Sequence, residues 1–319
     1  MDELQSLYKQ DYPAFIEPYF ASKSMQRLKG VDMNCGLQFT SNTGFSSYGP
    51  YSRYEHSVGV ACIIWRFTHD KKQTLAGLFH DISTRVFSHV IDFVKKDYLV
   101  QESTEDETRQ IILQDSVIMN QLLCDGISVD EVSDYHLYPI ADNDSPRLSS
   151  DRLEYTLGNL LNYRKHTIKE IEKYFNDLVV GISEYGSKEI MFQHPEIAEE
   201  FAFGALSCGI IYSCDFDRYG MEKLACILRK AFEETILTES DLYLTEIEVI
   251  KKLSESCLHD AWNEYTRLQD VTKDFAGDLM VDAKKRYIDP YICKHGRVTT
   301  FSATFQNAVN EFKNTDYHY

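Results

Sequence analysis

Between residues 52 and 92 the chain carries histidines and aspartates whose types and order are suited to metal chemistry. They occur in the segments SRYEHSVGV, LAGLFHD and FSHVID, and the candidates are, in order, His56, His80, Asp81, His89 and Asp92. A further candidate ligand, Asp151, lies far along the chain in SSDRLEYTL. Imidazole and carboxylate groups bind divalent transition metals, so this order predicts a metal site.

Two helices are needed to position these groups. From 53 to 69, apolar residues recur with helical spacing and His56 lies one turn before Val60, which predicts an amphipathic helix with an imidazole near its start. The apolar residues of 75–79 predict a second helix that delivers His80 and Asp81. Neighbouring side chains diverge by about 100° on a helix, so this pair can bind one ion only near the helix end.

The order of these fragments resembles the HD-domain metal-dependent phosphohydrolases. Within that superfamily, SRYEHSVGV, HDxxxxxFSH and SSDRLEY are similar to the deoxynucleoside triphosphate triphosphohydrolase branch, over roughly 27–163. The resemblance implies a mainly α-helical HD-domain core and one divalent metal held by four residues, His56, His80, Asp81 and Asp151. It also implies that Arg53 and Arg152 contact phosphate and that Tyr155 lines the sugar pocket.

The chain departs from the resembled branch at its acid/base residues. Many enzymes of that branch read H-D-x-x-H, whereas Thr84 stands at the second histidine here. They also carry a later His-Glu pair, where this chain offers only the acids Glu102 or Glu105. His89 is then the remaining candidate for a general acid, with Asp92 three residues on to orient it. The alternative is a surface histidine paired with its neighbouring aspartate.

Several of these residues also have interpretations without a metal. The dipeptide His-Asp occurs at 69–70, 80–81 and 259–260, so by itself it carries little information. His69 is expected to be solvated at a helix end, and His259 to be structural or exposed. Asp151 alone would be a first-turn aspartate favoured by the helix dipole, with Ser149 or Ser150 as the cap.

Composition limits the classes of partner. The 319 residues include 33 basic and 50 acidic side chains, for a net charge of −17, which argues against a nucleic-acid partner. A small phosphorylated substrate, in particular a nucleotide, remains compatible, and a homo-oligomer is left open. Histidine with carboxylate ligation suits Fe, Mn, Ni, Zn or Co without choosing among them.

The start of the chain and its cysteines indicate a cytoplasmic protein without a membrane partner. MDELQSLYKQ lacks the basic and apolar regions of a secretory signal, and the longest apolar run, 58–65, is far short of the roughly 20 residues that span a bilayer. The eight cysteines form no C-x-x-C pair, which is compatible with free thiols in a reducing compartment.

The remaining pattern predicts three segments. An N-terminal segment, 1–24, precedes the metal-binding core, 25–175, and a C-terminal region, 176–319, contains a hairpin and helices packed on that core. DLVVGISEY and KEIMF flank Gly186-Ser187 and predict the hairpin. Apolar stripes in 199–214, 221–235 and 243–268 predict the helices that follow it.

We therefore expect a metal-dependent phosphohydrolase that acts on a phosphate ester, in particular a (deoxy)nucleotide. The alternative is a catalytically silent regulatory HD-domain protein that binds a nucleotide or a metal, which would have no need of a positioned acid such as His89. A third alternative is a helical interaction protein without a metal, which requires the motif to be coincidental.

Overall fold

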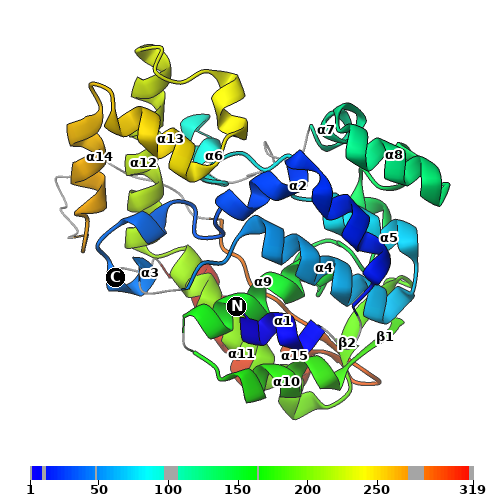
Figure 1. Cartoon of the computed structure of the whole chain (residues 1–319). Coiled ribbons are helices and arrows are strands. Elements are labelled where there is room, and N and C mark those ends of the chain that lie inside the picture. The colour runs from blue at the N-terminus through cyan, green and yellow to red at the C-terminus, as the bar shows by residue number, and fades with distance from the viewer. Residues whose placement is uncertain are drawn as a thin grey trace.

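The protein is mainly α-helical. The computed structural model describes residues 2–8, 12–46, 49–96, 107–163, 165–271 and 284–315. Helices α4 (Arg53–Thr68) and α9 (Ser150–Asn162) pack against each other in the middle of the molecule, and α5 (Lys71–Phe79) packs on α4 (Figure 1). The expected fold class, mainly α with a small β element, is confirmed.

The other helices surround this centre. In Figure 1, α12 to α14 lie on one side, α7 and α8 on the opposite side, and α10, α11 and the strands below. Their bounds are α1 (Asp2–Tyr8), α2 (Lys23–Arg27), α3 (Thr43–Ser46), α6 (Val90–Val94), α7 (Thr108–Gln114), α8 (Ser116–Asp125), α10 (Ile168–Asp177), α11 (Pro195–Tyr212), α12 (Asp215–Glu233), α13 (Glu246–Ser254), α14 (His259–Thr266), α15 (Val298–Phe301) and α16 (Ala303–Asn314). The stripe at 243–268 thus forms two helices.

The predicted hairpin is present and belongs to a larger sheet. β1 (Leu178–Ile182) and β2 (Lys188–Phe192) pair antiparallel, with Leu178 opposite Phe192. β2 continues in parallel to β3 (Tyr291–Ile292), which pairs antiparallel with β4 (Gly296–Arg297). The sequence analysis missed β3 and β4, because two-residue strands are too short to show the period of two that identifies a strand.

The three largest apolar clusters hold the helices together. The largest joins residues of α4, α9, α10, α11, α16 and the sheet, the second joins α6 with α12 to α14, and the third joins α4 and α5 with α8. Members of the predicted C-terminal region, such as Phe201, therefore share a core with Leu157 of the predicted metal-binding core. The division into three segments itself stays a prediction.

No single helix among the described residues has the length and apolarity to cross a membrane. The consecutive helices α11 and α12, which meet at 44°, satisfy that test only as a bent pair, by length and composition. All eight cysteines are free thiols.

Candidate metal centre

The start of α4 positions the first imidazole. The Ser52 side chain accepts from the Glu55 backbone N–H, and the Glu55 carboxylate accepts in return from the Ser52 backbone N–H. This reciprocal pair fixes where the helix begins. His56 follows in the first turn and is buried.

The end of α5 positions the second imidazole. Asp70 caps the start of this helix, and His80 directly follows its last residue, where the chain turns. His80 Nδ1 lies 2.7 Å from the Gly77 carbonyl oxygen, to which it donates. This bond leaves Nε2 of the same ring free to face the interior, and Asp81 comes next in the turn.

The first two turns of α9 supply two carboxylates. Ser149 caps the helix by accepting from the Arg152 backbone N–H, as the sequence predicted for Ser149 or Ser150. Asp151 lies one residue inside the helix, and Glu154 lies one turn later on the same face, towards α4.

These elements bring together three of the four predicted metal ligands. Ligand atoms of His56, His80 and Asp151 all lie within 4.8 Å of one another. The two Nε2 atoms are 3.2 Å apart, and His56 Nε2 lies 3.0 Å from Asp151 Oδ1. Asp81 flanks the group, with Oδ2 3.6 Å from His80 Nε2 and 3.9 Å from His56 Nε2. Two imidazole nitrogens and carboxylate oxygens thus converge on one point.

A buried carboxylate that the sequence analysis did not assign orients His56. Glu154 Oε2 lies 2.5 Å from His56 Nδ1 and also accepts from the Tyr51 hydroxyl. Gly59 makes this contact possible, because a Cβ at position 59 would lie 2.5 Å from Glu154 Oε1. Carboxylates that bind the far nitrogen of a metal-ligating histidine fix its tautomer and increase its basicity.

The electrostatics of the cluster favour positive charge at the point of convergence. Burial alone would lower the pKa of His56, but hydrogen bonds with Asp151 and Glu154 outweigh it and raise the pKa to about 10. Burial would likewise raise the pKa of Asp151, yet its bond with His56 and the charges of His56 and His80 lower it to about 2. An ionised Asp151 beside two imidazole Nε2 atoms is a donor set that fits a divalent cation.

Arg53 and Thr84 hold Asp81 in place. Arg53 Nη1 donates to both Asp81 oxygens, at 3.2 and 3.0 Å, and the Thr84 hydroxyl donates to Asp81 Oδ1 at 2.7 Å. Although burial raises it, the pKa of Asp81 lies far below its usual range because of Arg53, His80 and His56. The residue that replaces the resembled branch's second histidine therefore serves to orient a predicted ligand.

His89 and Asp92 also contact each other as predicted from their spacing. His89 is the residue before α6, and its Nδ1 lies 3.0 Å from Asp92 Oδ2. The Asp92 side chain is fully buried, whereas that of His89 is 31% exposed. Burial lowers the pKa of His89, nearby Arg286 and Arg53 act in the same direction, and Asp92 opposes them. These effects together favour the neutral form of its ring.

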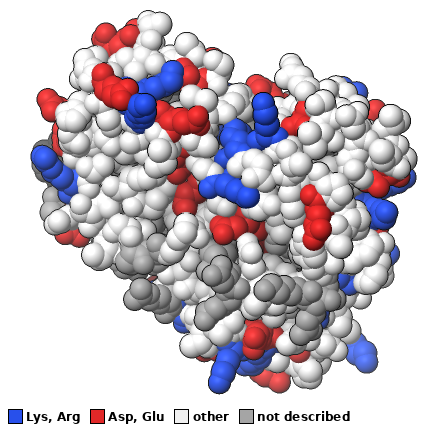
Figure 2. All heavy atoms as spheres, in the orientation of Figure 1, with Lys and Arg blue, Asp and Glu red and all other residues white. Residues whose placement is uncertain are grey.

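One cavity of about 510 Å³ connects the cluster with the other predicted residues. Tyr155 lines it, and burial raises the pKa of its hydroxyl to about 12. Arg152 lines it as well, but its guanidinium is bound by Asp142, by the carbonyl oxygen of Arg147 and by Asn143. Arg152 therefore stabilises the 142–147 turn through these bonds. Figure 2 shows acidic and basic side chains interspersed on one face of the molecule.

No model of a known protein family matches the chain. The chain is 28% identical to the uncharacterized protein YdhJ of Bacillus subtilis over 284 residues, 87% of this chain and 83% of that protein. It is 29% identical over 171 residues to the metal-dependent phosphohydrolase cns2 of Cordyceps militaris, which covers 52% of this chain and 46% of that protein. The chain thus spans less than half the length of the fungal relative.

A solved structure shares the fold. A hypothetical protein from Aquifex aeolicus superposes with a TM-score of 0.55 at 19% identity, over 79% of this chain and 71% of that one. The similarity to a protein named a metal-dependent phosphohydrolase supports the resemblance at the level of the HD-domain superfamily. The triphosphohydrolase branch stays a prediction.

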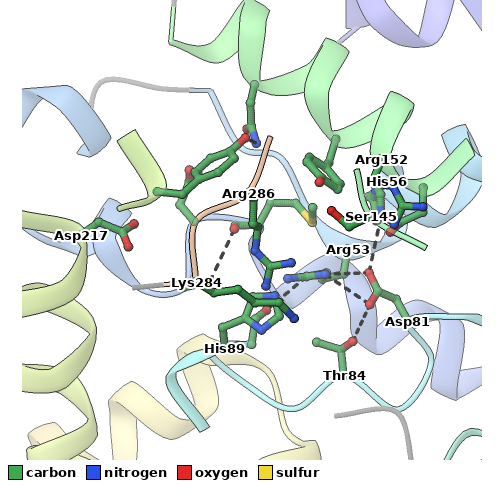
Figure 3. A pocket seen from close by; sticks show the side chains of 18 of the residues that line it. Arg53, His56, Asp81, Thr84, His89, Ser145, Arg152, Asp217, Lys284 and Arg286 are labelled. Carbon is green, nitrogen blue, oxygen red and sulfur yellow. Dashed lines mark hydrogen bonds and ion pairs between the residues drawn. The ribbon is translucent and has the colours of Figure 1, made fainter. Parts of the chain in front are cut away.

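The cavity also contains basic residues that the sequence analysis did not select. Lys284 and Arg286 line it and point towards the same region as Arg53 and His89 (Figure 3). Their segment lies against α11 at Gly209, where a Cβ would lie 2.1 Å from the Arg286 carbonyl oxygen. No motif surrounds these residues, so only the packing of distant segments reveals them. Glu102 and Glu105 lie outside the described residues.

Proposed function

We propose that this protein is a metal-dependent phosphohydrolase that acts on a phosphate ester, and that the ester is a (deoxy)nucleotide. The observation that carries the proposal is the convergence of His56, His80 and Asp151, with Asp81 beside them. Both histidines use Nδ1 for a bond within the protein and direct Nε2 at the same point. The name of the Cordyceps militaris relative supports the same activity.

The residues that would hold the metal are His56, His80, Asp81 and Asp151. Fe, Mn, Ni, Zn and Co all suit a donor set of imidazole and carboxylate. When bound, such an ion supplies Lewis acidity towards a phosphoryl oxygen and lowers the pKa of a water molecule. Glu154 and the Gly77 carbonyl oxygen keep the two imidazoles in the required orientation.

Basic residues opposite the cluster would bind the phosphate. Arg53 is engaged by Asp81 and by Ser88, so its charge first serves to keep Asp81 ionised. Lys284 and Arg286 bring further positive charge to the same cavity. Phosphate oxygens are well matched by guanidinium and ammonium donors, which orient the ester before the reaction.

His89 would transfer the proton to the leaving oxygen. Its Nδ1–H donates to Asp92, which leaves Nε2 as the atom that exchanges a proton. Burial lowers the pKa of His89, and without substrate the neighbouring Arg286 and Arg53 lower it further. A bound phosphate offsets those two charges, raises the pKa again, and allows the ring to take up the proton that it donates.

The test combines metal analysis with a panel of esters. The purified protein should contain one divalent metal per chain by mass spectrometry, and should release phosphate from at least one nucleotide when loaded with Mn, Fe, Co, Ni or Zn. If the metal-loaded protein binds nucleotides but does not hydrolyse them, the proposed phosphohydrolase activity is contradicted and the regulatory alternative is favoured. Protein without metal in any preparation would contradict the metal-dependent enzyme and leave only the nucleotide-binding form of the regulatory alternative.

A further inference from the structure

The cavity is larger than the metal cluster and a phosphate require. At about 510 Å³ it falls in the range of sites that enclose a small organic molecule. Figure 3 places Asp217 across the cavity from His56 and Asp81. The residues of this far part, which we call the distal arm, are Asn159 of α9, Tyr163 just after α9, Tyr212 of α11, and Asp217 and Met221 of α12.

Two buried oxygen atoms in the distal arm lack hydrogen-bond partners among the described residues. They are Asn159 Oδ1 and Asp217 Oδ2. Asn159 Nδ2 donates to the Tyr212 hydroxyl at 2.6 Å, so the orientation of the amide is fixed and Oδ1 remains as an acceptor. Both residues line the same cavity. Buried polar atoms nearly always have partners, so their two unpartnered oxygens point to a ligand that supplies them.

Apolar and aromatic side chains form much of the rest of the distal arm, and Arg218 lines the cavity beside Asp217. Leu37, Phe45 and Met221 contribute aliphatic and aromatic surface, and three tyrosines, Tyr155, Tyr163 and Tyr212, complete the lining. Such walls suit a flat ring with a few polar edge atoms, whereas a phosphosugar would need a polar partner for each hydroxyl. A nucleobase combines a flat ring with hydrogen-bond donors on its edge.

We infer that Asp217 is a substrate-binding residue that binds the polar edge of a nucleobase, with Asn159 Oδ1 as a second acceptor. The inference rests on the proposed function, because it assumes that the phosphate of the same ligand lies at the cluster of His56, His80 and Asp151. It assigns the nucleobase as the part of the substrate that the distal arm binds, and Asp217 as the residue that recognises it.

The state of the Asp217 carboxyl agrees with this role. Only 7% of the residue is exposed, and burial raises its pKa well above the usual range although Arg218 and Arg286 oppose the shift. This shift favours the protonated carboxyl, which offers one O–H donor beside one acceptor. Every nucleobase presents a donor next to an acceptor on its pairing edge, which a neutral carboxyl can match with two bonds.

Variants at Asp217 test this inference by nucleoside binding, which does not depend on turnover. Calorimetry would measure the binding of adenosine, guanosine, cytidine and uridine. Asp217→Asn keeps a donor beside an acceptor and should retain the affinity of the preferred nucleoside within about threefold. Asp217→Leu removes both and should weaken it by roughly tenfold or more, the worth of one or two buried hydrogen bonds. Glu233→Leu, an exposed position on the same helix, is the matched control.

A second readout separates this inference from the proposed function. The ring of p-nitrophenyl phosphate has no nucleobase edge, so its hydrolysis by the parent protein tests the proposed function without depending on the contact assigned to Asp217. Absence of hydrolysis of every ester, with Asp217-dependent nucleoside binding intact, would refute the proposed function alone. The inference is overturned if no nucleoside binds at millimolar concentration, or if Asp217→Leu binds as tightly as the parent. Should Asp217→Leu unfold by thermal melting, Asp217→Val serves the same comparison.

Discussion

The same dipeptide, His-Asp, lies in two very different surroundings at the end of α5 and at the start of α14. His80 is buried, donates to the Gly77 carbonyl oxygen and directs Nε2 at a second imidazole and a carboxylate. His259 is exposed, and its two nitrogens contact the Ser254 carbonyl oxygen and the Asn263 amide. Burial and convergent neighbours, rather than the dipeptide, therefore distinguish a candidate metal ligand from a surface residue.

A third copy of the dipeptide has a purely structural role. His69 adopts a positive φ of 50° and ends α4, while Asp70 caps α5 by accepting from the Lys72 and Gln73 backbone N–H groups. This pair connects the two helices that carry His56 and His80. It thus contributes to the candidate site by ending α4 and by capping the start of α5.

The largest expected effect comes from Asp81→Ala at the end of α5. Losing this carboxylate removes a predicted ligand and leaves the buried Arg53 guanidinium without its main partner, so charge is no longer balanced. Metal content measured by mass spectrometry should fall to a trace, and hydrolysis with it. Circular dichroism would confirm that the variant is folded. Full metal occupancy in a folded Asp81→Ala variant would contradict the ligand assignment.

The next largest effect is expected for His89→Gln. If His89 is the general acid, hydrolysis should fall by roughly 10²- to 10⁴-fold while folding and metal content stay unchanged. Asp92→Asn should be impaired less, because it alters only the orientation and proton affinity of the ring. If His89→Gln hydrolyses the ester at the parental rate, His89 is not the general acid, although the protein is still a hydrolase. Glu102 and Glu105 would then be the next candidates for the acid.

A smaller effect is expected for Glu154→Gln, which keeps the shape of the side chain but removes its charge. His56 would lose the carboxylate that fixes its tautomer and increases its basicity, so metal affinity should fall by about 10- to 100-fold. Competition with a chelator of known affinity measures this change. Gly59→Ala should have a similar effect, since its Cβ would displace the Glu154 carboxylate. An unchanged affinity in both variants would show that Glu154 has no role in the site.

Sequence reasoning could predict those parts of the site that lie within continuous helices. His56 follows a helix start that Ser52 specifies, Ser149 stands where a cap was expected, and the i,i+3 spacing placed His89 beside Asp92. The hairpin was also predictable, because two β-branched segments flank a turn at Gly186, which has a φ of 76°. In these cases the signal and the contact lie within a few residues of each other.

The remaining features depend on packing between distant segments. Glu154 stood next to a predicted ligand, yet its contact with His56 requires both the approach of α9 to α4 and the absence of a side chain at Gly59. Lys284, Arg286 and Asp217 reach the cavity from the C-terminal part of the chain, with no local pattern to mark them. A buried carboxyl such as Asp217 also looks like an ordinary first-turn aspartate in the sequence.

For the His69-Asp70 pair, which connects α4 and α5, we expect a change in stability alone. Asp70→Ala removes two bonds to the first turn of α5 and should lower the free energy of unfolding by about 1 kcal/mol, the usual worth of an N-cap. Denaturant titration measures the loss. Metal affinity should remain within error of the parent, and Asp70→Ser, which restores a cap, should recover most of the stability.

The smallest effect is expected for the exposed His259-Asp260 pair. Changing both His259 and Asp260 to Ala replaces two solvated side chains at the start of α14, and such surface changes usually alter stability by no more than about 0.5 kcal/mol. Metal content and hydrolysis should stay at parental values. The double variant is therefore the matched control for Asp81→Ala, because both remove an aspartate from the same dipeptide. Loss of metal from a folded His259→Ala, Asp260→Ala protein would show that the wrong His-Asp pair had been assigned to the site.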